Sequence, residues 1–197
     1  METNLTKNPS LLAWLDEKVE LLKPSKIMWI DGSKEQIDAL KKEAVETGEM
    51  IKLNEDLLPD CYLHRTAEND VARVEDRTLI CSREEKDAGP TNHWMEPSKA
   101  YKMLYDIARG SYQGRTMYII PYSMGPVGSP FSKIGVEITD SIYVVLNMNI
   151  MTRIGKKVLD TLGDSNDWVR GMHCKCNVRS RKEMDLPVPR GRHYHLR

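Results

Sequence analysis

The stretch GRTMYIIPYSMGPVGSPFSKIGVEITDS, from Gly114 to Ser141, most constrains the fold, because it places turn-forming residues between runs of strand-forming residues. Thr116–Ile120 and Ile134–Thr139 are predicted strands. Pro121–Pro130 is a predicted loop, in which three prolines preset the backbone and two glycines allow positive φ. A strand is also predicted at Tyr143–Leu146, and the polar residues before it favour antiparallel pairing. The sequence therefore predicts a mixed sheet.

The N-terminal third predicts a strand–helix–strand unit. Ile27–Ile30 and Met50–Leu53 are the predicted strands, and the helix between them begins after Ser33, which has capping-box spacing to Gln36. Gly48 is predicted to end this helix. A unit of about thirty residues has the size of a right-handed parallel crossover and favours an α/β sheet. The inward positions expected for the helix are Ile37, Leu40, Ala44 and Val45.

Three more helices and one more strand complete the predicted fold. The first helix has Asn8, Pro9 and Ser10 at its start and Pro24 after its end, with Leu11, Leu12, Leu15, Val19 and Leu22 on one face. The others are predicted at Ser98–Ala108 and Asn149–Leu162, and the strand at Arg73–Cys81. The core is expected to receive Tyr101, Leu104, Tyr105 and Ala108 from one helix and Ile150, Ile154 and Leu159 from the other.

Two nucleotide-binding motifs are excluded by their spacing. The turn Asp31-Gly32-Ser33 lacks the spaced glycines of a dinucleotide fingerprint. In the loop after Ile120, Gly125 and Gly128 are followed by Ser129 and a proline that removes a backbone donor, whereas a phosphate cradle needs a lysine and a hydroxyl at fixed positions.

Composition sets the wider limits. The chain has 197 residues, a length that favours one compact domain, and its 29 basic residues equal its 29 acidic residues. No net charge attracts nucleic acid or an anionic membrane, and no apolar run reaches a membrane-spanning length. The start lacks the pattern of a secretory signal, and four cysteines are too few for a disulfide framework. We expect a soluble, cytoplasmic protein that binds neither nucleic acid nor membrane.

The local sequence suggests Arg73 as a candidate carboxylate-binding residue. It follows a polar loop at the start of a predicted strand, where a guanidinium can hold a carboxylate through two parallel hydrogen bonds. The alternative is an ordinary exposed ion pair with Asp70, Glu75 or Asp76.

The run His173-Cys174-Lys175-Cys176 offers a possible start of a zinc site. A structural zinc ion needs four ligands, and the nearby candidates are only His193 and His195. We therefore predict no metal ligands in this chain.

The last twenty residues, 178–197, carry six Lys or Arg residues against Glu183 and Asp185, with two prolines and no periodicity. They are predicted to be a disordered tail. No nucleic-acid-binding module accompanies this charge, so a non-homologous end is favoured over a nucleic-acid-binding tail.

Two collinear segments, NDVARVEDRT at Asn69–Thr78 and the string from Gly114, closely resemble the GTP-dependent phosphoenolpyruvate carboxykinases. The likeness runs from the start to about residue 177. It implies a domain at residues 1–177 with the α/β fold of that family's N-terminal lobe, a mixed β-sheet flanked by helices, and residues 178–197 as the tail.

The resemblance implies specific roles. Arg73 matches the family arginine that binds the carboxylate of oxaloacetate or phosphoenolpyruvate, and Glu75 matches a glutamate that holds the mobile lid. The family reaction is a decarboxylation in gluconeogenesis that converts oxaloacetate and GTP to phosphoenolpyruvate, GDP and carbon dioxide. It uses manganese as well as magnesium accompanying the GTP.

The family's nucleotide loop and metal ligands come later in its sequence than this chain extends. We therefore expect no catalytic or metal-ligating residue here, no cofactor bound by the chain alone, GTP only through the missing lobe, and no turnover by this truncated form. The alternative is a stand-alone, non-catalytic α/β binding or interaction module that uses the Gly125–Pro130 loop and an exposed sheet edge.

Overall fold

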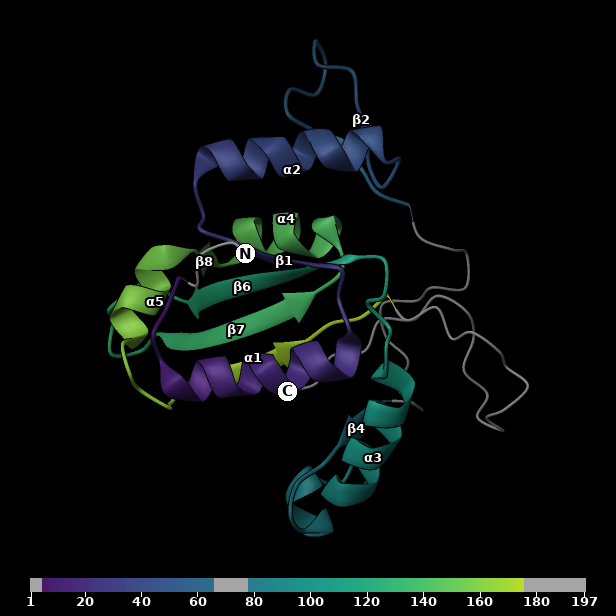
Figure 1. The fold of residues 1–197 in the computed structure, drawn as a ribbon, viewed down its shortest axis with the longest axis vertical. Helices are drawn as coiled ribbons and strands as arrows, with labels where there is room; N and C mark the ends of the chain where they lie inside the picture. Colours follow the sequence, from purple (N-terminus) through teal and green to yellow (C-terminus); the bar gives the residue numbers. More distant parts are fainter. Residues whose placement is uncertain (1–4, 66–77, 176–197) are drawn as a thin grey trace, which may run out of the picture.

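The computed structural model describes residues 5–65 and 78–175. Its centre is a five-stranded sheet in the order β1-β6-β7-β9, with β8 paired to the second half of β6 beyond the end of β1 (Figure 1). Its strands are β1 (Lys26–Trp29), β6 (Thr116–Met124), β7 (Lys133–Thr139), β8 (Arg153–Ile154) and β9 (Val169–Met172).

The sheet is mixed, as predicted. β1 runs parallel to β6 and β7 runs parallel to β9, whereas β6 pairs antiparallel with both β7 and β8. The carboxyl ends of β7 and β9 therefore lie together at one edge. The helices are α1 (Pro9–Leu22), α2 (Lys34–Glu46), α3 (Pro97–Ala108), α4 (Ile142–Met151) and α5 (Lys156–Leu162). Within the described residues, no helix is long and apolar enough to cross a bilayer.

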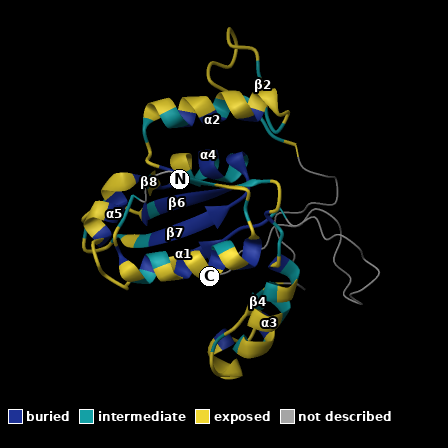
Figure 2. Ribbon diagram, viewed as in Figure 1, coloured by how far each residue is buried: buried dark blue, intermediate teal, exposed yellow. Residues whose placement is uncertain are grey.

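Helices cover both faces of the sheet, because side chains alternate along each strand. On β6, Met117 and Ile119 enter the core under α1, whereas Tyr118 and Ile120 enter a second core under α2 and α4. Figure 2 shows this layering, with a buried sheet between helices whose outer faces are exposed. The α/β class with flanking helices is confirmed.

Local capping predictions are confirmed at two helix starts. The Asn8 side chain accepts from the N–H of Leu11 at 3.1 Å, and the Ser33 hydroxyl accepts from the N–H of Gln36 at 3.2 Å. The Gln36 amide does not complete the capping box. It accepts from the Asp31 N–H at 2.9 Å and donates to the Trp29 carbonyl at 2.8 Å, so it ties α2 to the end of β1.

The predicted crossover unit is wrong. β2 (Ile51–Lys52) pairs antiparallel with β3 (Tyr62–Leu63) in a separate ribbon, and the parallel partner of β1 is β6, ninety residues along the chain by register. The register pairs Lys26 with Thr116. β2 is exposed and too short to fill a central position. Val45 was expected to face inward on α2, but it is exposed. The residues that α2 buries are Ile37, Leu40 and Ala44.

The predicted strand at Tyr143–Leu146 is also wrong, since these residues lie in α4. The predicted helix at Asn149–Leu162 is in fact the end of α4, then β8, then α5. Ile150 is consequently exposed at the end of α4 instead of buried.

β6 continues through Pro121 to Met124, where a loop was expected. Pro121 has no N–H to donate to a neighbouring strand. This is tolerated because Pro121 faces the side of β6 where the pairing with β1 has ended and the pairing with β8 has not yet begun. Its carbonyl faces that side and accepts from the Gly155 N–H at 2.9 Å.

Residues 78–108 form a small projecting lobe (Figure 1). It contains β4 (Leu79–Ile80) paired parallel with β5 (His93–Trp94), the 3₁₀ helix η2 (Glu85–Ala88) and α3. Of the predicted strand at Arg73–Cys81, only β4 lies within the described residues. Tyr101, expected in the core, is exposed on α3, whereas Ala108 is buried.

Candidate functional site at the carboxyl edge of the sheet

Four charged residues meet where β7 and β9 end. We call this group the carboxyl-edge cluster: Glu49, Arg115, Asp140 and Lys175. They come from the loop after α2, the start of β6, the end of β7 and the segment after β9. The sheet topology explains why residues so far apart in sequence converge here.

Asp140 is the buried centre of one half of the cluster. Its side chain is 0% exposed, one carboxylate oxygen contacts Nη1 of Arg115, and the other accepts from the Lys175 N–H at 2.8 Å. The same Arg115 nitrogen donates to the Lys175 carbonyl at 2.8 Å. Burial raises the pKa of the Asp140 carboxyl, and the contacts with Lys175 and Arg115 offset this only in part.

Glu49 holds the other half. Its Oε1 accepts from the Lys175 ammonium at 2.5 Å, from the Ser141 hydroxyl at 2.8 Å and from the Tyr143 N–H at 3.1 Å. Burial acts to raise the pKa of Glu49, but these hydrogen bonds outweigh it and the pKa is lowered. The carboxylate also lies at the N-terminus of α4, where negative charge is favoured.

A neutral hydrogen-bonded layer supports the cluster. The buried Tyr112 hydroxyl donates to the His173 carbonyl, and burial, then the charge of Asp140, raises the pKa of Tyr112 well above its usual value. The His173 ring lies 2.8 Å from the Thr139 hydroxyl. The ends of β7 and β9 are thus joined by side chains as well as by the strand ladder.

The predicted residues Arg73 and Glu75 lie outside the described residues, so their roles stay predictions. Near the end of the described residues before this gap, His64 stacks on Tyr143 at 3.9 Å between ring centroids, and its Nδ1 lies 2.7 Å from the Glu49 carbonyl. In open α/β sheets, ligands commonly bind beyond the carboxyl ends of the strands. The edge is therefore the candidate site.

The possible zinc site receives no support from the described residues. Cys174 is in a disulfide, which removes the thiolate that zinc requires, and the His173 ring is engaged by Thr139. His193 and His195 lie outside the described residues. Within residues 5–65 and 78–175, no three His, Cys, Asp or Glu side chains are grouped to hold a metal ion. Cys61 and Cys81 are exposed free thiols.

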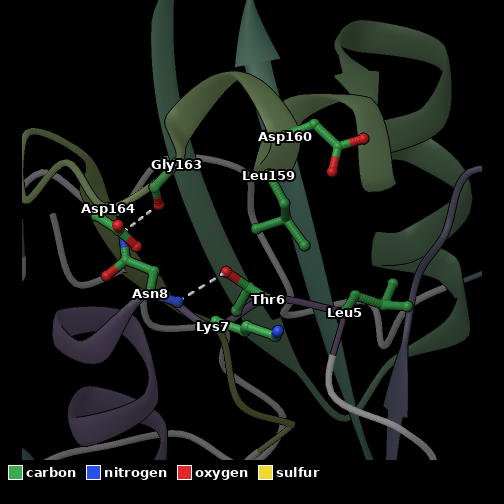
Figure 3. Close-up of a pocket in the computed structure, with 8 residues that line it drawn as sticks. All are labelled: Leu5, Thr6, Lys7, Asn8, Leu159, Asp160, Gly163 and Asp164. Atoms are coloured by element: carbon green, nitrogen blue, oxygen red, sulfur yellow. Dashed lines mark hydrogen bonds between the residues drawn. The ribbon is translucent and has the colours of Figure 1, made fainter.

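A hollow of about 360 Å³ lies elsewhere, between the start of α1 and the end of α5 (Figure 3). Its Asn8 side chain donates to the carbonyls of Gly163 and Ser165 at 2.8 and 2.9 Å, while its oxygen caps α1. Asn8 therefore acts as a structural clamp, and Asp160 is paired with Lys156. This hollow shares no residue with the carboxyl-edge cluster.

Sequence reasoning missed the carboxyl-edge cluster. Asp140 is one of the polar residues before the strand predicted at Tyr143–Leu146, and Lys175 belongs to the possible zinc run. A lone charged residue directly after a predicted strand was the available signal, but the partners of Asp140 are 25 and 35 residues away, so no local spacing connects them.

The fold and this site define a mixed α/β domain with a buried ionic cluster at the carboxyl edge of its sheet. A family model described as the phosphoenolpyruvate carboxykinase N-terminal domain matches residues 13–194. The chain belongs to this family. The match extends past the predicted boundary at residue 177, but residues 176–197 lie outside the described part and the boundary stays a prediction.

Similar proteins bear the name phosphoenolpyruvate carboxykinase (GTP). That of Anaeromyxobacter dehalogenans strain 2CP-C is 51% identical over 178 residues, which are 89% of this chain and 30% of that protein. That of Corynebacterium jeikeium strain K411 is 48% identical over 168 residues, 85% of this chain and 28% of that protein. The chain thus spans less than a third of the length of these relatives.

Proposed function

We propose that this chain forms the N-terminal, substrate-binding part of a GTP-dependent phosphoenolpyruvate carboxykinase. The observation that carries the proposal is the 51% identity across 89% of the chain to a protein of that name. The reaction proposed for the whole enzyme converts oxaloacetate and GTP to phosphoenolpyruvate, GDP and carbon dioxide, a step of gluconeogenesis.

Arg73 is the proposed carboxylate-binding residue, and Glu75 is proposed to contact a lid. A planar guanidinium matches the two oxygens of a carboxylate, and oxaloacetate and phosphoenolpyruvate each carry one.

The chain alone is proposed to bind substrate without turning it over. One charge-assisted contact contributes about 1.5–3 kcal/mol, whereas enzymes lower barriers by about 8–23 kcal/mol. Manganese, and magnesium with GTP, are proposed to be held by residues of the rest of the enzyme, as the family resemblance implies.

A titration of the ¹⁵N-labelled chain with phosphoenolpyruvate, followed by NMR, tests this proposal. Arg73→Gln is expected to weaken binding about tenfold or more, because a charged carboxylate contact is lost. Arg83→Gln is the matched control, since Arg83 is another guanidinium, exposed in the described part. Equal affinity of the Arg73→Gln and unsubstituted chains would overturn the assignment.

A second candidate, a stand-alone interaction module, is favoured by the apolar side chains exposed at one end of the sheet. Such a module should be monomeric and unfold cooperatively by itself. The substrate-binding part of a larger enzyme is instead expected to be marginally stable or to aggregate when alone. Sedimentation and urea unfolding of the purified chain separate the two.

A further inference from the structure

A disulfide lies directly beside the carboxyl-edge cluster. Cys174 is disulfide-bonded, and it precedes Lys175, a member of that cluster. The sequence has four cysteines, of which Cys61 and Cys81 are free thiols. Within one chain this leaves Cys176 as the partner, so the disulfide links the residues on either side of Lys175.

Lys175 contacts the cluster through both its main chain and its side chain. Its N–H donates to the Asp140 carboxylate at 2.8 Å, and its carbonyl accepts from the Arg115 guanidinium at 2.8 Å. Its ammonium lies 2.5 Å from the Glu49 carboxylate. The N–H and the carbonyl point at their partners together only at one setting of the φ and ψ angles of Lys175, because these two angles orient its peptide groups.

The disulfide restricts these same two angles. It closes a ring that contains both peptide groups of Lys175, and Cys174 is 2% exposed and packs in the core under α1, which holds one end of the ring. A bond between cysteines so close in sequence restrains the unfolded chain little, because it closes a very short loop. Its effect therefore falls on the conformation of Lys175 rather than on overall stability.

The state of the other cysteines shows that the oxidation is selective. Cys61 and Cys81 are exposed and remain thiols, whereas the buried Cys174 is oxidised. Burial raises the pKa of the Cys81 thiol, and a thiol that stays protonated reacts slowly, because the thiolate is the reactive form. Exposure alone does not explain which cysteine is paired.

We infer that the Cys174 disulfide is a reversible redox switch for the carboxyl-edge cluster. In the oxidised state it holds Lys175 in the conformation that contacts the other three members. A dithiol reduces it by thiol–disulfide exchange: the protein S–S bond breaks, both cysteines become thiols, and the dithiol gives up two electrons and two protons as it closes its own S–S bond. In the reduced state the backbone of Lys175 is freer, and its contacts with the cluster open more often.

This inference concerns the order of the cluster and not substrate binding, so the phosphoenolpyruvate titration can succeed or fail independently. Amide hydrogen exchange of the full chain, followed by NMR, tests it in a Cys61→Ser/Cys81→Ser background. Peptide mapping by mass spectrometry first checks that Cys174 and Cys176 are joined in the air-oxidised protein.

Exchange of the Lys175 N–H is compared before and after reduction with dithiothreitol. The control amide is the Ile30 N–H, which donates to the Ile119 carbonyl at 2.9 Å within the sheet. We expect the Lys175 N–H to exchange at least about tenfold faster after reduction, with the Ile30 N–H unchanged. Reoxidation with oxidised glutathione should restore the slow rate, and Cys176→Ser should show the fast rate with or without dithiothreitol.

Equal exchange of the Lys175 N–H in the two redox states would overturn the inference. Equal acceleration of the Ile30 N–H would overturn it as well, because the disulfide would then stabilise the whole fold. A peptide map in which Cys174 is not joined to Cys176 would remove its basis.

A second measurement connects the switch to Glu49. The shift in urea midpoint caused by Glu49→Gln is expected to fall by about half or more on reduction, because Lys175 is then no longer held against this carboxylate. Glu55→Gln is the matched control, since Glu55 pairs with Lys52, and its small effect should be the same in both states. An effect of Glu49→Gln that does not depend on the redox state would contradict the inference.

Discussion

The carboxylate of Glu49 lies 2.5 Å from the ammonium of Lys175, although 126 residues separate them in sequence. This contact joins the loop after α2 to the segment after β9, and Ser141 and Tyr143 connect both to the start of α4. The Glu49 side chain therefore links three segments at this edge: the loop after α2, the segment after β9 and the start of α4.

Glu49→Gln is predicted to lower the free energy of unfolding by about 2 kcal/mol, because a partly buried ammonium loses its counter-charge. Urea unfolding monitored by circular dichroism measures the change. Glu55→Gln is the control: Glu55 makes an exposed pair with Lys52, and its loss should change stability by less than about 0.5 kcal/mol. Equal effects of the two substitutions would show that the Glu49 contacts are not stabilising.

The contribution of Glu49 should depend on pH. Its pKa is lowered on folding from an ordinary value of 4.5, so its stabilisation is present above that pH and is lost as pH falls through the folded pKa. The difference in unfolding free energy between the unsubstituted chain and Glu49→Gln is predicted to shrink between about pH 7 and about pH 3.5. A difference that grows on acidification would reverse the assigned sign.

Arg115→Met is predicted to cost about 3–5 kcal/mol at neutral pH, because it leaves the buried Asp140 carboxylate without its guanidinium. Arg109→Met should cost little, since its pair with Asp106 is exposed and 3.9 Å long.

The cost of Arg115→Met should also fall in acid. Burial already raises the pKa of Asp140 above 3.8, and loss of Arg115 raises it further. A carboxyl with a raised folded pKa favours the folded state below its unfolded pKa, and this advantage disappears as pH rises through the folded pKa. The unfolding free energies of the unsubstituted chain and of Arg115→Met, measured from neutral to acidic pH, should differ less at acidic pH. A difference that does not change with pH would contradict a buried Asp140 carboxyl that titrates.

Gly155→Ala is predicted to destabilise the chain by more than about 3 kcal/mol. Gly155 has φ of 108°, and an added Cβ would lie 2.1 Å from the Asp31 carbonyl oxygen, where the turns after β1 and β8 meet. Gly48→Ala isolates the effect of backbone strain, because Gly48 has φ of 75° with nothing within 4 Å. It should cost about 1 kcal/mol. Similar melting temperatures for both variants would mean that the turns separate easily.

The features predicted correctly from sequence are those set by neighbouring residues. The caps at Asn8 and Ser33 and the strands β1 and β7 depend on local chemistry, and the predictions agree with the structure within one or two residues. The family resemblance supports the α/β class and the mixed sheet more directly than hydrophobic periodicity does.

The errors have a non-local cause. The run Tyr143–Leu146 is apolar and partly β-branched, which suits a strand, but these residues pack as a helix on the second core. The partner of β1 and the members of the carboxyl-edge cluster are decided by the order of strands in the sheet, which no short spacing encodes. The roles of Arg73 and Glu75 remain predictions.

A chimeric enzyme tests the central claim most directly. Residues 13–175 of this chain replace the aligned residues of the A. dehalogenans enzyme, and kcat/KM for oxaloacetate is measured with GTP and manganese. We predict an active chimera in which Arg73→Ala lowers kcat/KM about 10- to 100-fold while Arg83→Ala leaves it unchanged. A folded but inactive chimera, or one in which Arg73→Ala has no more effect than Arg83→Ala, would contradict the account.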